Sequence, residues 1–264
     1  MSDAYHIVVC AGIVPDPLQT LEPMTTPAGP ALKNEMMLPA VLDPWASHAL
    51  YEAANLATHV PASKVWLVSA APKTKLQQVM MNVAQKASFE LVPVDTAATG
   101  FTDAHEVARL LAAAIQSIPS LDCSRLLLFG GWESASRGAG VTMQLVAEQL
   151  GITEQFQGVD QIKVQPDGSF EILERIEGGR HLASDCAGPP ALLGWATGNL
   201  PEPRNNPQIG MANMRSIIPA LQKAKAGALS QNLRFLSVTP PKQQRQTRIV
   251  KDRPAEEIAA ELAE

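Results

Sequence analysis

The chain has 264 residues, of which 46% are hydrophobic and 18% charged, and its formal net charge is −5. This length suits one large α/β domain with an appendage, and the mild acidity argues against a general affinity for nucleic acid or anionic membranes. There is no run of roughly 20 apolar residues, which a membrane helix needs, and no signal-peptide pattern. Three scattered cysteines argue against a disulfide framework or a zinc site. We therefore expect a cytoplasmic protein with no direct membrane insertion and no nucleic acid partner.

Strand and helix patterns alternate through the first 150 residues. The apolar run 5–11 predicts a strand buried on both faces, and the Pro-rich segment 18–42 predicts an excursion from the sheet, such as a small hairpin. Asp43 is a good N-cap for the next helix, and Pro44 suits its first position. The further predicted strands are 64–70, 91–94 and 125–129, and the predicted helices are 43–58, 73–86, 102–118 and 141–150. This alternation predicts an α/β fold with a Rossmann-like parallel sheet, right-handed crossovers and helices on both faces.

After about residue 150 the sequence no longer alternates between strand and helix patterns. Strand patterns 161–165 and 169–173 flank the turn Pro166-Asp167-Gly168 and predict a hairpin. A further strand is predicted at 191–196, irregular chain at 197–207, and a helix at 211–225 that Pro219 interrupts. We expect residues 1–225 to form the nucleotide-binding domain, including a hairpin and partner-recognition segment at about 160–225.

Residues 226–264 are expected to form a C-terminal arm. Within it 233–238 is strand-like, 240–248 is polar and basic, and 255–263 predicts a short helix. This arm cannot bury enough apolar surface to fold alone, so it is expected to lie on the domain or on a partner.

A glycine-rich loop is the most informative stretch. The apolar strand 125–129 ends at Gly130-Gly131, and a loop of small residues leads to a helix with Thr142 near its start. Parallel α/β folds bind anionic ligands at such places, because strand ends and helix N-termini present backbone N–H groups. The alternative is an ordinary strand-to-helix turn.

Familiar catalytic patterns are absent from the sequence. There is no P-loop and no nucleophile elbow, and Gly138-Ala139-Gly140 begins a dinucleotide fingerprint without its third glycine. The five histidines lack metal-ligand spacing, and Cys10 and Cys123 are expected to be small buried thiols. Glu174 and Glu177 are interpreted as a solvated strand end and not as an acid–base pair. The residues favour a nucleotide-binding module over an enzyme.

The order of several motifs resembles the β subunit of electron transfer flavoproteins over nearly the whole chain. Val14-Pro15-Asp16-Pro17 follows the first strand, as a similar turn does in that family, and Asp43-Pro44-Trp45 is similar to its Asn-Pro-Phe helix start. Val68-Ser69-Ala70-Ala71-Pro72 is similar to its Val-Ser-x-Gly-Pro. Residues 131–142 align without a gap onto its nucleotide loop. The segments 206–218 and 241–250 look closest to the branch associated with nitrogen fixation.

The resemblance implies an adenine nucleotide α-hydrolase-like fold and a heterodimer. The partner would be the α subunit, which holds most of an electron-carrying FAD, while the β subunit buries AMP or, in the bifurcating branch, a second FAD. Electrons would pass from a flavin-dependent dehydrogenase toward a quinone reductase. The chain would then be an electron carrier subunit and not an enzyme, with no catalytic residue and no metal site; whether it bifurcates electrons is left open.

Carried over position by position, the resemblance also implies the nucleotide contacts. They are Cys10, Asp43, Pro44, Trp45, Ala46, Ala70, Gly131, Ser134, Ser136, Arg137, Gly138, Ala139, Gly140, Val141 and Thr142. Gly140 and Val141 stand where the family has Asn and Gln, so two side-chain contacts are lost. Arg137 is interpreted either as a phosphate partner that offsets this loss or as a solvated surface arginine.

A partner-recognition segment is implied at about 209–220, with Met214 at the apolar anchor position and Met211 nearby; the alternative is that both methionines pack inward. Arg175 replaces a family glutamate before Gly178-Gly179. Two other functions remain open on the same sheet. One is an adenine-nucleotide-binding enzyme such as an ATP pyrophosphatase, although 11–15 lacks the Ser-Gly-Gly-type loop of that class. The other is a regulatory module of the stress-protein type, against which the long Pro-rich later half argues.

Overall fold

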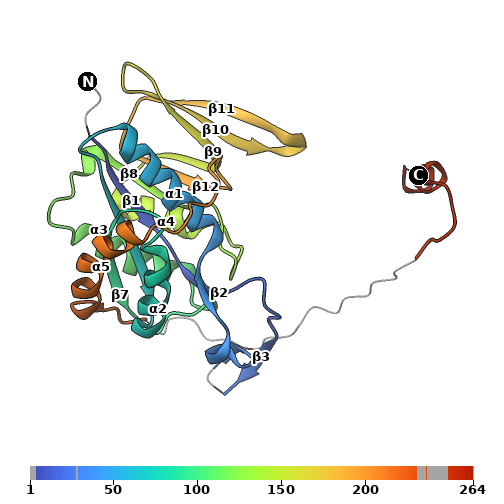
Figure 1. The fold of residues 1–264 in the computed structure, drawn as a ribbon, viewed down its shortest axis with the longest axis horizontal. Helices are drawn as coiled ribbons and strands as arrows, with labels where there is room; N and C mark the ends of the chain where they lie inside the picture. The colour runs from blue at the N-terminus through green and yellow to red at the C-terminus, as the bar shows by residue number, and fades with distance from the viewer. Residues whose placement is uncertain (1–3, 28, 231–235, 237–248, 264) are drawn as a thin grey trace.

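The first apolar run forms the central strand of a nine-stranded sheet (Figure 1). The computed structural model describes residues 4–27, 29–230, 236 and 249–263. Every residue of β1 (His6–Cys10) is buried. Parallel strands β6 (Lys64–Ala71) and β8 (Leu126–Gly131) flank it on its two edges. A strand in this position is covered on both faces, which is why its sequence is a continuous apolar run.

The strand order reverses beside β1. The order across the sheet is β11-β10-β9-β12-β8-β1-β6-β7-β13. The remaining strands are β7 (Glu90–Asp95), β9 (Glu154–Val164), β10 (Phe170–Ile176), β11 (Arg180–Cys186), β12 (Ala191–Trp195) and β13 (Lys225–Ala226). The chain passes from β1 through β6 to β7 in one direction and then returns to place β8 on the other side of β1. The carboxyl ends of β1 and β8 therefore form a topological switch point, where open parallel sheets bind ligands.

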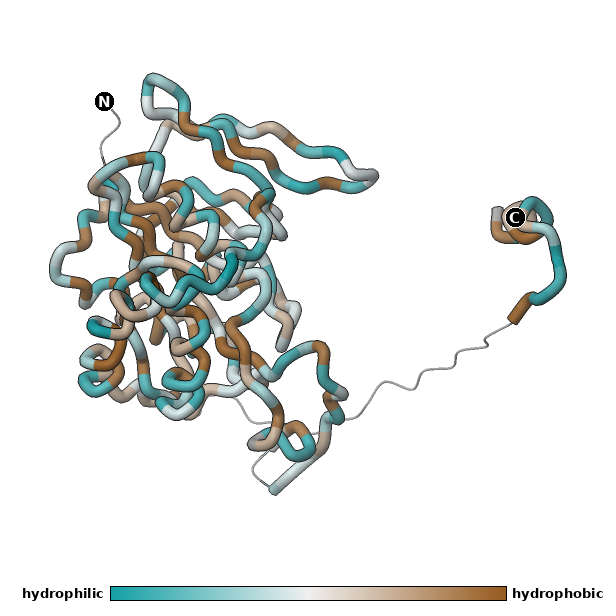
Figure 2. Tube along the Cα trace, viewed as in Figure 1, coloured by the Kyte–Doolittle hydropathy of each residue, from teal (hydrophilic) through white to brown (hydrophobic). Residues whose placement is uncertain are grey.

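Helices cover both faces of the sheet. One layer holds α1 (Pro44–His59), α2 (Lys73–Val83) and α5 (Pro207–Gln222), and the other holds α3 (Ala104–Gln116) and α4 (Thr142–Leu150). Alternate residues of β1 point to opposite layers, so Ile7 and Val9 pack in the first and Val8 and Cys10 in the second. Figure 2 shows apolar stretches running through this layered body. The predicted Rossmann-like fold is confirmed.

The excursion after β1 contains two small antiparallel pairs. Strands β2 (Ile13–Pro15) and β5 (Ala40–Leu42) form one pair, and β3 (Pro23–Thr26) and β4 (Gly29–Leu32) form the predicted hairpin. Short 3-10 helices occur at η1 (Glu35–Met37), η2 (Cys123–Arg125) and η3 (Glu177–Gly179). None of the helices in the described part of the chain has the length and apolar character to cross a membrane.

Two sequence predictions differ from the structure, and one strand was not predicted. Helix α5 begins at Pro207, capped by the Asn206 side chain, and continues through Pro219 without an interruption. Pro219 lies close to the end of the helix, where one missing N–H group removes a single hydrogen bond. Strand β11 was not predicted, because most of its residues are exposed and its sequence is polar. Cys123 is exposed because it lies in η2, before the buried strand, whereas Cys10 is buried as expected.

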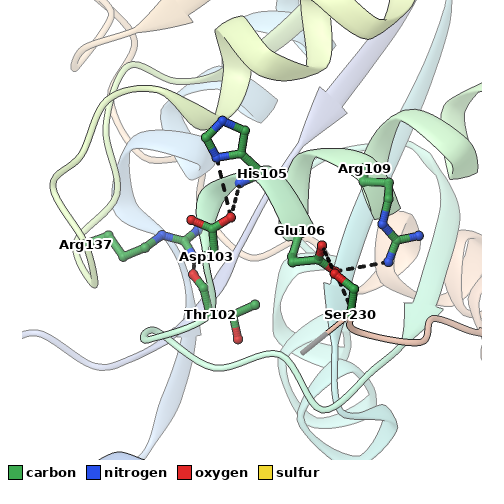
Figure 3. Close-up of polar contacts among 7 residues, drawn as sticks. All are labelled: Thr102, Asp103, His105, Glu106, Arg109, Arg137 and Ser230. Carbon is green, nitrogen blue, oxygen red and sulfur yellow. Dashed lines mark hydrogen bonds and ion pairs between the residues drawn. The ribbon is translucent and has the colours of Figure 1, made fainter. Parts of the chain in front are cut away.

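The start of the predicted arm is attached to the sheet and to α3. Strand β13 contains the boundary predicted at residues 225–226 and pairs with β7. The Glu106 carboxylate accepts hydrogen bonds from the N–H and hydroxyl of Ser230 (Figure 3). Arg109 donates to the Ala228 carbonyl at 2.6 Å. Helix α6 (Ala255–Ala263), the predicted short helix, stands apart from the sheet in Figure 1. The predictions for 233–238 and 240–248 lie outside the described residues, except for residue 236.

A proline marks the outer edge of the sheet. Strand β13 pairs with β7 only at Val94 and Asp95, and the Gly227 N–H donates to the Asp95 carbonyl at 2.8 Å. Alternate residues of a strand direct their backbone polar groups to opposite neighbours. Pro93 lies two residues before Asp95, so its backbone faces the same side of β7. In the parallel register it lies one position before the start of β13.

Asn213 connects α5 to the rest of the domain. It is 7% exposed, and its amide nitrogen donates to the carbonyls of Ala84 at 2.7 Å and Ala87 at 2.6 Å. These two carbonyls follow α2 and precede β7, so the side chain connects three elements.

We expect Asn213→Ala to lower the free energy of unfolding by about 2–3 kcal/mol, because it leaves two buried carbonyls without a donor. Urea unfolding of the full chain measures this change. The matched control is Ser216→Ala on the same helix, where an exposed hydroxyl binds a carbonyl and the change should stay within about 0.5 kcal/mol. Equal effects of the two substitutions would contradict the assigned role of Asn213.

Candidate functional site

A cavity of about 80 Å³ lies at the switch point of the sheet. The carboxyl ends of β1, β6 and β8 form its floor, the loop after β8 forms one wall, and the first half of α3 forms another. The residues around it are Cys10, Ala11, Gly12, Asp43, Ala46, Ala70, Val107, Leu111, Gly131, Trp132, Glu133, Ser134, Arg137, Ala139, Gly140, Val141, Thr142 and Met143. Burial raises the pKa of the Cys10 thiol to about 12, so Cys10 contributes a neutral surface to the floor.

Two glycines at the end of β8 let both helix layers approach the strand. A Cβ atom on Gly130 would lie 2.5 Å from the sulfur of Met143, at the start of α4. On Gly131 it would lie 2.6 Å from the Cβ of Trp45 and 2.7 Å from the carbonyl oxygen of Glu133. The absence of side chains here brings the N-termini of α1 and α4 to the same strand end.

Asp43 fixes the loop after β8 to the start of α1. This carboxylate is 2% exposed. One oxygen accepts from the Trp45 N–H at 3.2 Å and caps α1, and the other accepts from the Ala135 N–H at 2.9 Å. Burial raises the pKa of Asp43, and these backbone N–H groups partly offset the rise. The side chain therefore acts as a bridge between two segments that are far apart in the sequence.

The loop itself is held by short local bonds and ends at an uncapped helix. The Ser134 hydroxyl accepts from the Arg137 N–H at 3.1 Å, and the Ser134 carbonyl accepts from the Gly138 N–H at 2.8 Å. Gly138 and Gly140 have φ values of 59° and 64°, which favour glycine. Within the described residues no side chain caps the N-terminus of α4 at Thr142, so its first N–H groups are available to an anion at the rim of the cavity.

Arg137 spans the gap between the loop and α3. Its guanidinium donates to the Thr102 carbonyl at 2.5 Å, directly before the Asp103 cap of α3 (Figure 3). Burial lowers the pKa of Arg137, and the negative charges of Asp103 and Asp43 oppose this shift. The half-buried position does not fit the interpretation as a fully solvated surface arginine.

The structure brings most of the predicted contact residues to this cavity. Those around it are Cys10, Asp43, Ala46, Ala70, Gly131, Ser134, Arg137, Ala139, Gly140, Val141 and Thr142, and those outside it are Pro44, Trp45, Ser136 and Gly138. The Trp45 side chain packs against Gly131, and Ser136 packs against Gly100. Sequence reasoning missed Val107 and Leu111, which are spaced four residues apart on α3. Helical spacing was visible, but only the fold packs this helix against β6 and α4, so that these two side chains reach the cavity.

The predicted recognition residues differ in exposure. Met211 is 65% exposed on α5, whereas Met214 is partly buried against the core. Glu174 accepts from the Gln157 N–H and the Ser184 hydroxyl, and Glu177 is exposed, so they form no carboxylate pair.

A second charged cluster lies on the antiparallel part of the sheet. Arg175 binds both oxygens of the buried Asp160, at 2.9 and 2.8 Å, and His181 contacts the same carboxylate at 3.0 Å. These contacts hold β10 and β11 to β9. Among the described residues, no group of three His, Cys, Asp or Glu side chains is arranged to hold a metal ion.

Comparison with known proteins gives no assignment: no family model matches the chain, and no curated protein matches it.

We expect Gly131→Ala to destabilise the protein by about 1–3 kcal/mol, because the new methyl group meets the Trp45 Cβ and a backbone oxygen that cannot easily move. The matched control is Gly12→Ala, since a Cβ atom at Gly12 meets nothing within 4 Å although the residue lines the same cavity. Thermal and urea unfolding measure both. If Gly131→Ala were as mild as Gly12→Ala, close packing at this strand end would not be required.

Proposed function

We propose that the chain is the β subunit of a heterodimeric electron transfer flavoprotein, which passes electrons from a flavin-dependent dehydrogenase toward a quinone reductase. The observation that carries this proposal is the position of the residues that the resemblance assigns to a nucleotide. Cys10, Asp43, Ala70 and most of the loop 131–142 are far apart in the sequence, yet they surround one cavity at the switch point. Ligands of open parallel sheets bind at this position.

The composition of the cavity fits an adenine nucleotide. Ala70, Val107 and Leu111 offer an apolar surface to a base, while Arg137, the Thr142 hydroxyl and the uncapped start of α4 offer donors to a phosphate. The volume of about 80 Å³ is smaller than the roughly 300 Å³ or more of typical ligand pockets. We therefore infer that the cavity widens when a nucleotide binds, and the smaller AMP fits this requirement better than a second FAD.

The electron-carrying FAD would be held mainly by the α subunit, and it supplies the redox chemistry of the complex. This chain would contribute a wall that excludes water and fixes the position of the partner. Trp45, half-buried at the first turn of α1, offers an aromatic surface that we assign to the side facing the flavin. We assign no bond-breaking step to any residue of the chain.

The partner contacts are proposed at two places. Met211 and Ile218 are exposed seven residues apart on α5 and offer a small apolar surface to a dehydrogenase. Because Met214 packs against the core, Met211 is the better anchor. The C-terminal arm from residue 226, including α6, would contact the α subunit, and the complex would be cytoplasmic.

The same cavity also supports an alternative, an adenine-nucleotide-binding enzyme or regulatory module. Binding sites at this position occur in proteins of many functions, and co-purification with an α subunit distinguishes the two.

Co-expression with an electron transfer flavoprotein α subunit tests the proposal. We expect a yellow complex with the visible absorption of oxidised flavin, and AMP together with FAD in the supernatant after denaturation. The chain purified alone serves as the control and should be colourless. A stable monomer that hydrolyses ATP, or a chain that never co-purifies with the α subunit, would refute the electron-transfer assignment.

We expect Met211→Ala to raise the KM of the complex for its dehydrogenase about fivefold, because it removes an exposed apolar anchor. Steady-state electron transfer from the dehydrogenase measures this, and the flavin content should not change. Met81→Ala is the matched control, since Met81 is a 54% exposed methionine on a different helix, α2, to which no partner contact is assigned. Equal KM values for the two variants would exclude Met211 from the contact.

A further inference from the structure

Arg137 joins two walls of the cavity. Its backbone belongs to the loop after β8, and its guanidinium reaches the Thr102 carbonyl at the start of α3 (Figure 3). Arg137 lines the cavity, as do Val107 and Leu111 of α3. The side chain therefore connects the loop to α3, and an outward movement of the loop would break this contact.

The guanidinium has more donors than its present partner can use. An arginine carries five N–H donors in a planar fork, and in the described part of the chain only the Thr102 carbonyl accepts from it. It forms no ion pair with a described carboxylate. A neutral carbonyl is a weaker partner than a phosphate, which can accept two parallel hydrogen bonds from the fork. The exchange of one acceptor for the other is therefore favourable.

The carboxylates near Arg137 differ in the hydrogen bonds that they already accept. Asp43 accepts from Trp45 and Ala135, and Asp103 accepts from the His105 N–H at 3.0 Å. Glu133 also lines the cavity, and its carboxylate lies 4.0 Å from the position of a Cβ on Gly138. This negative charge opposes an anion in the cavity, so Glu133 and Arg137 should act in opposite directions on a phosphate.

We propose that Arg137 acts as a latch on the cavity, which opens when a phosphate group binds the guanidinium. In the present arrangement it holds the loop after β8 closed against α3. The phosphate group of a nucleotide replaces the Thr102 carbonyl as the acceptor of the guanidinium, which frees the loop to move outward and admits the nucleoside. The inference rests on the nucleotide site of the proposed function, and it adds the residue that distinguishes a phosphorylated ligand from an unphosphorylated one.

The latch makes a specific prediction about two probes, AMP and adenosine. Titration calorimetry on the full-length chain should show AMP binding at least tenfold more tightly than adenosine. Arg137→Gln should weaken AMP binding about tenfold or more, because a charge-assisted contact is lost. The same substitution should leave adenosine binding unchanged or strengthen it, because no bond to Thr102 then has to break. A merely structural arginine would weaken both ligands together.

Two further variants keep the test independent of folding. Arg137→Lys retains the charge without the planar fork and should give AMP an intermediate affinity. Glu133→Gln removes the opposing charge and should tighten AMP binding severalfold without a change for adenosine. Arg109→Gln is the matched control, because this arginine binds Ala228 and Glu106 outside the cavity and should leave both affinities as in the wild type.

The outcomes separate this inference from the proposed function. If the wild type binds AMP and adenosine equally, the latch is overturned while the nucleotide site stands. If it binds neither, both the latch and the nucleotide site are overturned, although the flavin complex with an α subunit is judged by its own spectrum. A parallel loss of both ligands in Arg137→Gln with a folded protein would also overturn the latch.

Discussion

The candidate site depends on the buried carboxylate of Asp43. A charged group in this position is costly to bury, and backbone N–H groups from two separate segments, together with the charge of Arg137, partly offset the cost. One segment starts α1 and the other follows β8. This bridge joins the glycine-rich loop to α1, in addition to the packing of Gly131 against Trp45. The shape of the site thus depends strongly on one side chain that contributes little surface of its own to a ligand.

Much of the fold was predictable because its signals are local and periodic. Continuous apolar runs identified β1, β6 and β8, and Asp43 with Pro44 marked the start of α1. Prediction failed where tertiary contacts decide the outcome. Strand β11 is stabilised by its pairing with β10 and by the contact of His181 with Asp160 of β9, and its mostly polar sequence does not reveal these partners.

The candidate site was predictable in part for a different reason. Residues at strand ends and helix starts meet whenever a parallel sheet forms, so the glycine loop and the first turn of α1 could be joined from topology alone. The wall from α3 could not be anticipated, because it depends on which side of β1 each later strand is placed. The contact of Arg137 with Thr102 was hidden for the same reason, since it joins residues 35 positions apart through a backbone atom.

Pro93 has a consequence for the behaviour of the protein in a crowded solution. An unpaired sheet edge is a template on which another chain can add a strand, and such addition leads to aggregation. Along the outer side of β7, an approaching strand would meet a carbonyl but no N–H donor at Pro93, so its ladder of hydrogen bonds would break there. The two-residue strand β13 pairs with the residues that follow Pro93. The missing donor thus limits how far another chain could extend along this side of β7.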